Sequence, residues 1–391
     1  MVRTFGISIF IIILLINIRQ SGSAASAPPL TFRSQTGKCT LPGLEKCFCS
    51  WISGNDGRLD AVNCTGVGFE DMSVLHVIND TVKTIVFTGN DLTTLNVSVL
   101  KSATNLKNLD LSSNNINSIM PGGFSALQHL EELNLSNNSW MVKEDTELVF
   151  ENVTLKKLYL NNAFESRINA TMVHATPLSY VFGSKTVMGN LEDLHLASND
   201  MYFVDSEILC NMPKLRYLDL SHNHIYKLPC NATCLGGLQH LLFQNNSLSH
   251  MSQECISSLQ QPALKTLELN IIDNPFTCDC HMRPQYEWML NSSSSAHFDD
   301  TDKYKLLCHF PQKWAGQSIL HLNYSDFVCL TPDSGNRQMN FIPIIFGVIF
   351  ALVAVVILLF VCSKRHQIRK LFRSRHGDTS MMTAGYTSMD A

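Results

Sequence analysis

The sequence predicts a solenoid of short parallel strands, and three observations support this prediction. Leucines and an asparagine recur with the same spacing about every 24 residues through most of the chain. One cluster of cysteines precedes these repeats and another follows them. An uncharged apolar segment lies near the C-terminus. Together these features predict a stack of repeats that is closed at both ends and attached to a membrane.

Eight segments carry the repeated pattern. The second segment, residues 106–114, reads LKNLDLSSN, and the spacing falls within the range of leucine-rich repeats. The eighth segment is framed by Leu269, Ile271 and Asn274. Its first position is weak, because Thr266 occupies it. The first positions of the eight segments are Val82, Leu106, Leu130, Leu155, Leu191, Leu215, Leu238 and Thr266.

We therefore expect an α/β-type leucine-rich-repeat solenoid over residues 82–273, with mostly short parallel strands and little helix. In each repeat the leucines would point into a shared core, and the asparagine would bond backbone groups where the chain turns. Phe124 would fill the back of that core. Because no repeat buries its own apolar face, the stack must be continuous and its ends must be covered.

The fourth repeat departs from the pattern in two ways. Ala163 stands where the other repeats have asparagine, and the interval from Leu155 to Leu191 is about half a repeat too long. We expect an excursion of roughly a dozen residues to leave the solenoid within about residues 162–185.

Thirteen cysteines divide into groups along the chain. Four lie in an expected N-terminal cap at residues 39–68, and four lie in an expected C-terminal cap at residues 274–330. Four more, Cys210, Cys230, Cys234 and Cys255, lie within the repeats, where we expect two disulfides of open connectivity. The alternative is a zinc ion held by Cys230, Cys234, His222 and His224, but oxidation in the secretory pathway favours disulfides.

Two apolar segments predict the compartment. Residues 1–25 have the form of a secretory signal peptide, with a basic start, a short apolar run and small residues after it. Residues 341–362 are uncharged and long enough to span a bilayer as a single transmembrane helix. The basic residues that follow mark the cytoplasmic side. We therefore expect a type I plasma-membrane protein, with a linker at 331–340 and a cytoplasmic tail at 363–391.

Composition and motifs exclude several functions. The net charge of −4 offers no basic excess for a nucleic acid, and 45% hydrophobic residues exclude a disordered chain. The expected ectodomain has neither a His-Glu-x-x-His metalloprotease motif nor a Gly-x-Ser-x-Gly nucleophile elbow. We expect a protein that is not an enzyme, has no cofactor or metal, and recognises an extracellular or membrane protein.

The expected tail holds two further candidates. Cys362, at the cytoplasmic end of the span, is either a palmitoylation site or a free thiol. Tyr386 precedes Met389 by three residues, a spacing that could dock an endocytic adaptor or, after phosphorylation, an SH2 domain. A disordered tail is the alternative.

Eleven Asn-x-Ser/Thr sequons occur in the part placed outside the cell. Asn63 is a doubtful acceptor because Cys64 lies within its sequon. The ten expected acceptors are Asn79, Asn96, Asn134, Asn137, Asn152, Asn169, Asn231, Asn245, Asn291 and Asn323.

Strand alternation sends the residue between two core leucines onto the expected concave face, which solenoids commonly use for binding. A glycan at Asn134 would obstruct the N-terminal half of this face. The remaining candidates for partner contact are Tyr159, His195, Tyr217 and Leu242. The alternative is that these are ordinary exposed strand residues.

Residues 273–282, which read DNPFTCDCHM, followed by Trp288, resemble the trophoblast glycoprotein family. The LHLASN string at residues 194–199 and the long interval between the fourth and fifth repeats add to the resemblance, which extends over the ectodomain, the membrane span and the basic segment after it. By resemblance to the caps of leucine-rich ectodomains, the cap disulfides would join Cys39 to Cys49, Cys47 to Cys64, Cys278 to Cys308, and Cys280 to Cys329.

The resemblance implies a cell-surface glycoprotein that restrains Wnt/β-catenin signalling through a Wnt co-receptor. Two positions implicated in that activity differ, because the family's lysine and tyrosine correspond to Asn63 and Phe310 here. The C-terminus also lacks the family's PDZ ligand. We expect a modulator of Wnt reception, and the alternative is a cell-adhesion or guidance molecule without Wnt activity.

Overall fold

The structure is a computed structural model in which residues 35–52, 58–142, 149–165, 177–182, 188–291, 298 and 302–329 are described. All of them belong to the first of the two units into which the chain divides, Met1–Cys329. The expected signal peptide, linker, membrane span and tail lie outside these residues. Within them, none of the helices has the length and apolar character needed to cross a bilayer.

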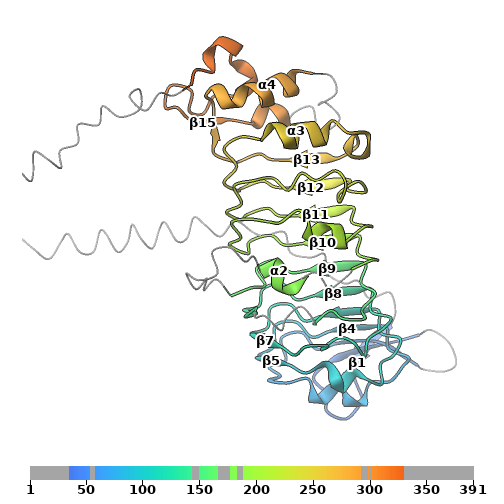
Figure 1. The fold of residues 1–391 in the computed structure, drawn as a ribbon. Helices are drawn as coiled ribbons and strands as arrows, with labels where there is room; N and C mark the ends of the chain where they lie inside the picture. The colour runs from blue at the N-terminus through green and yellow to red at the C-terminus, as the bar shows by residue number, and fades with distance from the viewer. Residues whose placement is uncertain are drawn as a thin grey trace, which may run out of the picture. The chain divides into compact units, whose positions relative to one another are not determined.

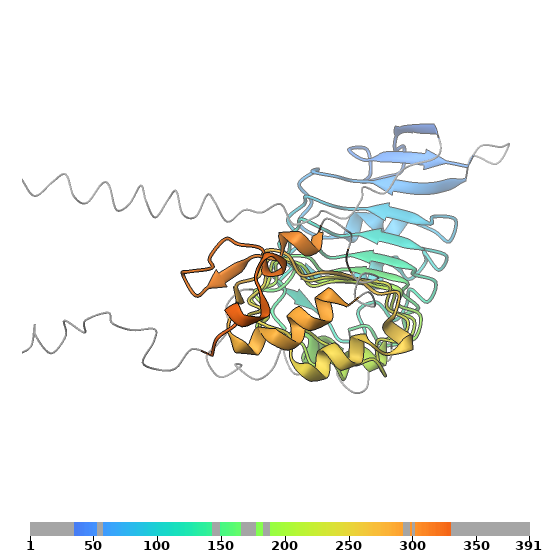
Figure 2. The same ribbon diagram turned by 90° about the horizontal axis from the view of Figure 1, so that it is seen from above.

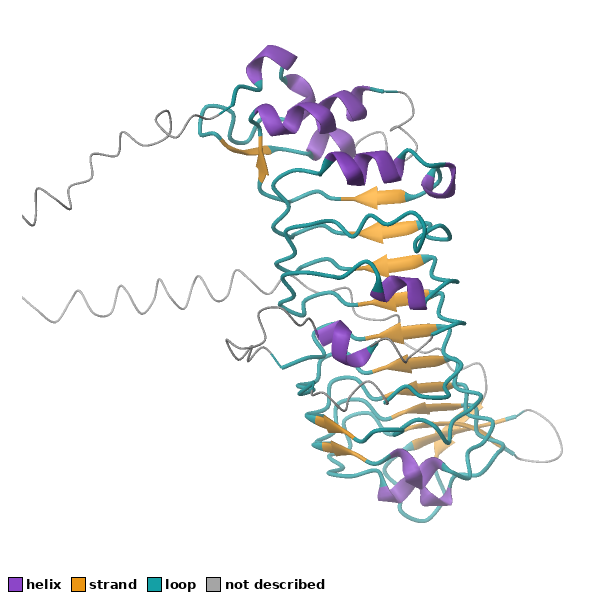
Figure 3. Ribbon diagram, viewed as in Figure 1, coloured by secondary structure: helices purple, strands orange, loops and turns teal. Residues whose placement is uncertain are grey.

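One sheet of eleven strands runs through the described unit, and its strands are stacked one above the next (Figures 1 and 3). From β3 onward every neighbouring pair is parallel and in register, whereas β1 and β2 form an antiparallel N-terminal end. The strands, in their order across the sheet, are β1 (Gln35–Lys38), β2 (Phe48–Trp51), β3 (Leu59–Asn63), β4 (Thr84–Val86), β6 (Asn108–Asp110), β8 (Glu132–Asn134), β9 (Lys157–Tyr159), β10 (Asp193–His195), β11 (Tyr217–Asp219), β12 (His240–Leu242) and β13 (Glu268–Asn270).

Short helical turns and two small sheets complete the coils, and Figure 2 shows the later coils lying over one another along the stack. This composition of strands with little helix confirms the predicted solenoid. The helical segments are η1 (Ser73–Val77), η2 (Val97–Leu100), α2 (Pro177–Val181), η5 (Ile208–Asn211), α3 (Gln253–Leu259), η6 (Pro262–Leu264), η7 (Cys280–Met282), α4 (Arg283–Leu290), η9 (Asp302–Lys305), η10 (Ile319–His321) and η11 (Tyr324–Asp326). The small sheets pair β5 (Thr94–Leu95) with β7 (Ser118–Ile119) and β14 (Phe276–Thr277) with β15 (Cys308–Phe310).

The core is a continuous column of aliphatic and aromatic side chains. The leucines at the centres of the repeat strands are buried, as the pattern predicts. Phe124 is fully buried at the back of the core, where its ring stacks on Phe150 with centroids 5.8 Å apart. Phe150 stacks in turn on Phe182, 5.9 Å away. These rings join successive coils, so burial that no single repeat achieves is shared along the stack.

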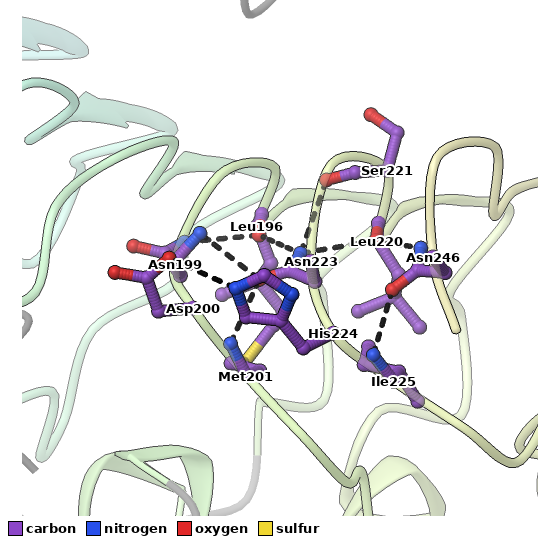
Figure 4. A network of polar contacts seen from close by, with 10 residues as sticks. All are labelled: Leu196, Asn199, Asp200, Met201, Leu220, Ser221, Asn223, His224, Ile225 and Asn246. Atoms are coloured by element: carbon purple, nitrogen blue, oxygen red, sulfur yellow. Dashed lines mark hydrogen bonds and ion pairs between the residues drawn. The ribbon is translucent and has the colours of Figure 1, made fainter. Parts of the chain in front are cut away.

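The recurring asparagines hold the backbone where each coil leaves its strand. The amide nitrogen of Asn223 donates to the carbonyl of Leu220 in its own repeat and to that of Leu196 in the preceding one, both at 3.0 Å. Its Oδ1 accepts the backbone N–H groups of Asn199 and Met201 at 2.9 and 3.1 Å (Figure 4). One buried amide therefore satisfies four backbone groups of two neighbouring coils.

The fourth repeat keeps the stack despite Ala163. Asn199 of the fifth repeat donates to the carbonyl of Leu160 at 2.7 Å and accepts the Ala163 N–H at 2.9 Å. In the third repeat, the Leu135 carbonyl is bonded by its own repeat's Asn138 at 2.7 Å. β9 and β10 remain paired in register across the long interval, so the excursion adds chain without displacing the sheet. Most of residues 162–185, where we expected it, lie outside the described residues.

The eighth repeat differs from its expected frame by one residue. Thr266 is exposed, and Leu267 is buried in its place. The Leu267 N–H donates to the Leu264 carbonyl at 3.0 Å, the same turn that Leu238 makes with Leu235. The first core position is therefore Leu267, because the turn before β13 is one residue shorter than in the other repeats.

Six disulfides cross-link the described unit. The cap bonds have the pairing that the resemblance implies, and the two central bonds each link residues about one repeat apart. Cys210 of the fifth repeat pairs with Cys234 of the sixth, and each of them lies 19 positions after the first residue of its repeat. The bonds are Cys39–Cys49, Cys47–Cys64, Cys210–Cys234, Cys230–Cys255, Cys278–Cys308 and Cys280–Cys329.

We expect Asn223→Ala to lower the free energy of unfolding by at least about 3 kcal/mol, because it leaves buried carbonyl and N–H groups without partners. Urea unfolding followed by circular dichroism measures this change. Asn115→Ala is the matched control, since Asn115 is exposed and donates only one side-chain bond that the structure records, to Asp91. Equal effects of the two substitutions would contradict the role assigned to the buried amide.

Candidate functional site

The sheet turns one face away from the core, and we call it the outer sheet face. It is formed by the first and third residues of each repeat strand from β4 to β13, because side chains alternate along a strand. The parallel register lines these residues up in two rows. The first row is Thr84, Asn108, Glu132, Lys157, Asp193, Tyr217, His240 and Glu268, and the third is Val86, Asp110, Asn134, Tyr159, His195, Asp219, Leu242 and Asn270.

Four rings from four consecutive repeats lie next to one another across these rows. The centroid of Tyr159 lies 4.4 Å from that of His195, and His195 lies 4.8 Å from Tyr217. Tyr217 lies 5.9 Å from His240. We call these four residues the ring row. Their spacing follows from the strand separation of about 4.8 Å, which places equivalent side chains in contact.

Tyr159 begins the ring row but is not an exposed contact residue, so its expected place in an accessible patch is wrong. Its side chain is only 3% exposed, because it stacks on His195 and is hydrogen-bonded to Glu132. Burial raises the pKa of the phenol, and it also raises the pKa of the Glu132 carboxyl. Tyr159 therefore supports the neighbouring ring.

His195 and Tyr217 form the half-buried centre of the ring row. Burial lowers the pKa of the His195 imidazole, against the opposing influence of the Asp219 and Asp193 carboxylates. Burial raises the pKa of Tyr217 to about 12, and the same two carboxylates add to this shift. Both rings are therefore neutral at pH 7, and both lie in the field of Asp193 and Asp219.

Contacts with carboxylates lie at the two ends of this centre. Lys157 Nζ lies 3.0 Å from Asp193, which raises the pKa of the lysine. His240 Nδ1 lies 2.9 Å from a Glu268 carboxylate oxygen. Leu242 is half-buried beside them in the third row. The arrangement can offer the exposed parts of these rings and the carboxylates of Asp193 and Glu268 to a partner.

The sequence identified His195, Tyr217 and Leu242 but missed His240 and Asp193. The prediction followed the residue between the two core leucines, which is the third strand position, and added only Tyr217 from the first position. The residue two places earlier has the same alternation and faces the same side. Counting both positions would have found the missing residues.

Asn63 and Phe310, the two positions chosen through the family resemblance, lie at opposite ends of the stack. Asn63 ends β3, and its side chain accepts the backbone N–H of Thr65 at 3.0 Å. Phe310 ends β15 in the C-terminal cap and is 43% exposed. Eight strand spacings separate β3 from β13, or roughly 38 Å. These residues do not belong to one site with the ring row.

The zinc alternative is wrong, because Cys230 and Cys234 are bound in disulfides and neither offers a thiolate. His224 lies beside Asp200, at 3.5 Å (Figure 4). Among the described residues, Asp279, Cys280 and His281 have their ligand atoms close together. Cys280 is also in a disulfide, which leaves too few donors for a structural zinc site.

The sequons differ in accessibility. Asn134 is only 9% exposed, and its Oδ1 accepts the Ser136 N–H at 3.0 Å. This position does not favour the glycan that was expected to cover part of the outer sheet face. Asn231 is half-buried, whereas Asn169, Cys362 and Tyr386 lie outside the described residues. The exposed sequon asparagines are Asn79, Asn96, Asn137, Asn152, Asn245, Asn291 and Asn323.

We expect the stability of the folded chain to fall as the pH decreases below about 6.5, in part through His195. The unfolded imidazole takes up a proton near that pH, whereas burial resists protonation in the folded state. His195→Phe keeps a ring in the stack and should reduce the loss of stability between pH 7.5 and 5.5. Urea unfolding at several pH values tests this expectation. The exposed control His129→Phe should leave the pH dependence unchanged, and equal slopes for wild type and His195→Phe would refute the assignment.

When the full chain is expressed in mammalian cells, we expect Asn137 to carry a glycan and Asn134 to remain unmodified. The two sequons are three residues apart, so they share the same local chain and differ in exposure. Glycopeptide mass spectrometry after enzymatic deglycosylation in heavy-oxygen water measures both. Full occupancy of Asn134 would show that its buried position does not prevent modification.

Comparisons with known families agree with the repeats. Residues 80–139 match the family described as Leucine rich repeat, and residues 214–235 match a second family of the same description. Neither is a catalytic family.

Two curated relatives match most of this chain. Trophoblast glycoprotein of Macaca fascicularis is 27% identical over 304 residues, which are 74% of this chain and 69% of the relative. Trophoblast glycoprotein of Mus musculus is 28% identical over 275 residues, 68% of this chain and 58% of the relative. The crystal structure of human trophoblast glycoprotein, also called Wnt-activated inhibitory factor 1, has the same fold. It is 24% identical, with a TM-score of 0.59 over 69% of this chain and 94% of the human one. The chain is therefore a leucine-rich-repeat protein related to trophoblast glycoprotein.

Proposed function

We propose that this chain is a cell-surface recognition protein that binds a protein partner through the outer sheet face and restrains Wnt/β-catenin signalling. The ring row carries the proposal. His195 and Tyr217 are half-buried and His240 is 41% exposed, so flat rings from three repeats are accessible on one face. Aromatic side chains that are accessible and held rigid are typical anchors of protein interfaces.

The Wnt part of the proposal rests on the relatives. One similar protein bears the name Wnt-activated inhibitory factor 1, and the similarity to trophoblast glycoprotein extends over 74% of this chain. The differences at Asn63 and Phe310 would make the activity of this chain weaker than that of the family. The partner proposed here is a Wnt co-receptor.

The proposed location is the plasma membrane in type I orientation. The apolar segment at residues 341–362 and the basic residues after it support this placement. The six disulfides support an oxidising compartment for the solenoid. Tyr386 would then lie in the cytoplasm, where an endocytic adaptor could reach it.

We expect expression of the full chain in Wnt-responsive cells to lower β-catenin reporter output and the surface level of the co-receptor. The double substitution Tyr217→Leu and His240→Leu should abolish this effect, because it removes two accessible rings while keeping apolar volume. Reporter output and surface labelling measure the result at matched expression.

The control is the double substitution Tyr202→Leu and Tyr226→Leu, which removes two exposed rings outside the outer sheet face. An unchanged reporter with the wild-type chain would reject Wnt restraint, and aggregation of expressing cells would then favour the adhesion alternative. Equal activity of both double variants would reject the ring row as the contact surface.

A further inference from the structure

We infer that His250 and His281 form a binding site for a divalent transition-metal ion, Zn²⁺ or Cu²⁺, at the junction of the seventh repeat and the C-terminal cap. The Nε2 atoms of the two imidazoles would hold the ion, and water would fill its remaining coordination positions. The site needs no cysteine, and it adds a metal site to a chain for which the sequence predicted none. The inference does not depend on the outer sheet face or on Wnt activity.

The two imidazoles are neighbours, although one lies in the seventh repeat and the other in η7 of the cap. The ring centroids of His250 and His281 are 5.9 Å apart, and the ring planes are inclined by 27°. With Zn–N bonds of about 2.0–2.1 Å, two imidazoles on one tetrahedral ion have centroids roughly 5 Å apart. Both residues are exposed, so rotation of the side chains can bring the two Nε2 atoms onto one ion.

Backbone bonds on both sides of His250 hold this residue against the cap. The Ser249 carbonyl accepts the Thr277 N–H at 2.9 Å. The Met251 N–H donates to the buried side chain of Gln285, also at 2.9 Å. Thr277 ends β14 and Gln285 lies in α4, so His250 is fixed to two elements of the cap. A ligand whose backbone is already positioned loses little conformational entropy when the ion binds.

Each imidazole also has a hydrogen-bonding neighbour at Nδ1. Both oxygens of the Asp279 carboxylate lie near His281 Nδ1, at 3.2 and 3.3 Å, and Oδ1 accepts the His281 backbone N–H at 2.9 Å. The Ser249 hydroxyl lies 3.1 Å from His250 Nδ1. Neighbours that accept the Nδ1–H group leave the lone pair of Nε2 free, which is the arrangement that surrounds histidine ligands in metal sites.

The donor set selects the ion. Neutral imidazoles suit Zn²⁺ and Cu²⁺, whereas Ca²⁺ and Mg²⁺ prefer oxygen ligands. Cu²⁺ should bind more tightly than Zn²⁺, following the general order of divalent ions at nitrogen sites. The bound ion would link the seventh repeat to the C-terminal cap, and it would stabilise the folded chain because the unfolded chain does not hold the two imidazoles together.

Isothermal titration of Zn²⁺ into the untagged full chain in detergent tests the inference. His250→Gln and His281→Gln should each weaken Zn²⁺ binding at least about tenfold, because each leaves a single imidazole. Asp279→Asn keeps an acceptor for the His281 N–H and should weaken binding about tenfold, because it changes the partner of the ring. His129→Gln removes an exposed imidazole elsewhere and is the matched control. Mg²⁺ at the same concentration should not bind.

Electron paramagnetic resonance of the chain with one equivalent of Cu²⁺ gives a second measurement. We expect two coordinated imidazole nitrogens in wild type and in His129→Gln, and one in His250→Gln or His281→Gln. Thermal unfolding shows whether each variant is folded, and Zn²⁺ should raise the unfolding temperature of wild type more than that of these two variants. Zn²⁺ binding that both variants leave unchanged, or weaken no more than His129→Gln does, would overturn the inference, because the ion would then bind elsewhere.

Discussion

The solenoid depends on the buried asparagine amide that joins each coil to the next. At this point the chain leaves its strand and turns, so its backbone groups are buried without a sheet partner. Asn223 satisfies two carbonyls and two N–H groups at once, and Asn114 and Asn246 make corresponding bonds in their repeats. Neither a leucine nor an alanine could replace these bonds. Each coil that has this asparagine is therefore held at a fixed height against the coil before it, and the fourth repeat, which has Ala163, is the exception.

The constant offset between neighbouring coils also aligns the side chains of the outer sheet face. Because every strand from β4 to β13 is in register with its neighbours, equivalent residues stand in rows with nearly constant spacing. Rings at these positions lie in contact even though they are 22 to 36 residues apart in the sequence, and Tyr159 stacks on His195. The ring row is thus a consequence of the backbone register. A change in any one turn would displace it.

The periodic features could be predicted from the sequence, whereas local adjustments could not. The leucine spacing predicts eight strands, and the structure contains them. Only one register of the strands buries the repeated apolar face. Thr266 shows the limit: the turn before β13 is shorter by one residue, so Leu267 takes its place in the core. Tyr159 shows another limit, since alternation predicts which face a side chain takes but not how far Glu132 and His195 cover it.

The long interval between the fourth and fifth repeats occurs at the start of the ring row. Lys157 and Asp193 flank it in the sequence, yet their strands are adjacent and their side chains form an ion pair at 3.0 Å. The sheet therefore tolerates a longer interval between two repeats while β9 and β10 stay paired in register. Loop closure becomes only slowly more unfavourable as a segment lengthens, so such an addition is compatible with the same stack. The interior asparagines fix the scaffold, and the outer rows are free to vary in chemistry. The N-terminal part of this face therefore carries Val86 where the C-terminal part carries His195.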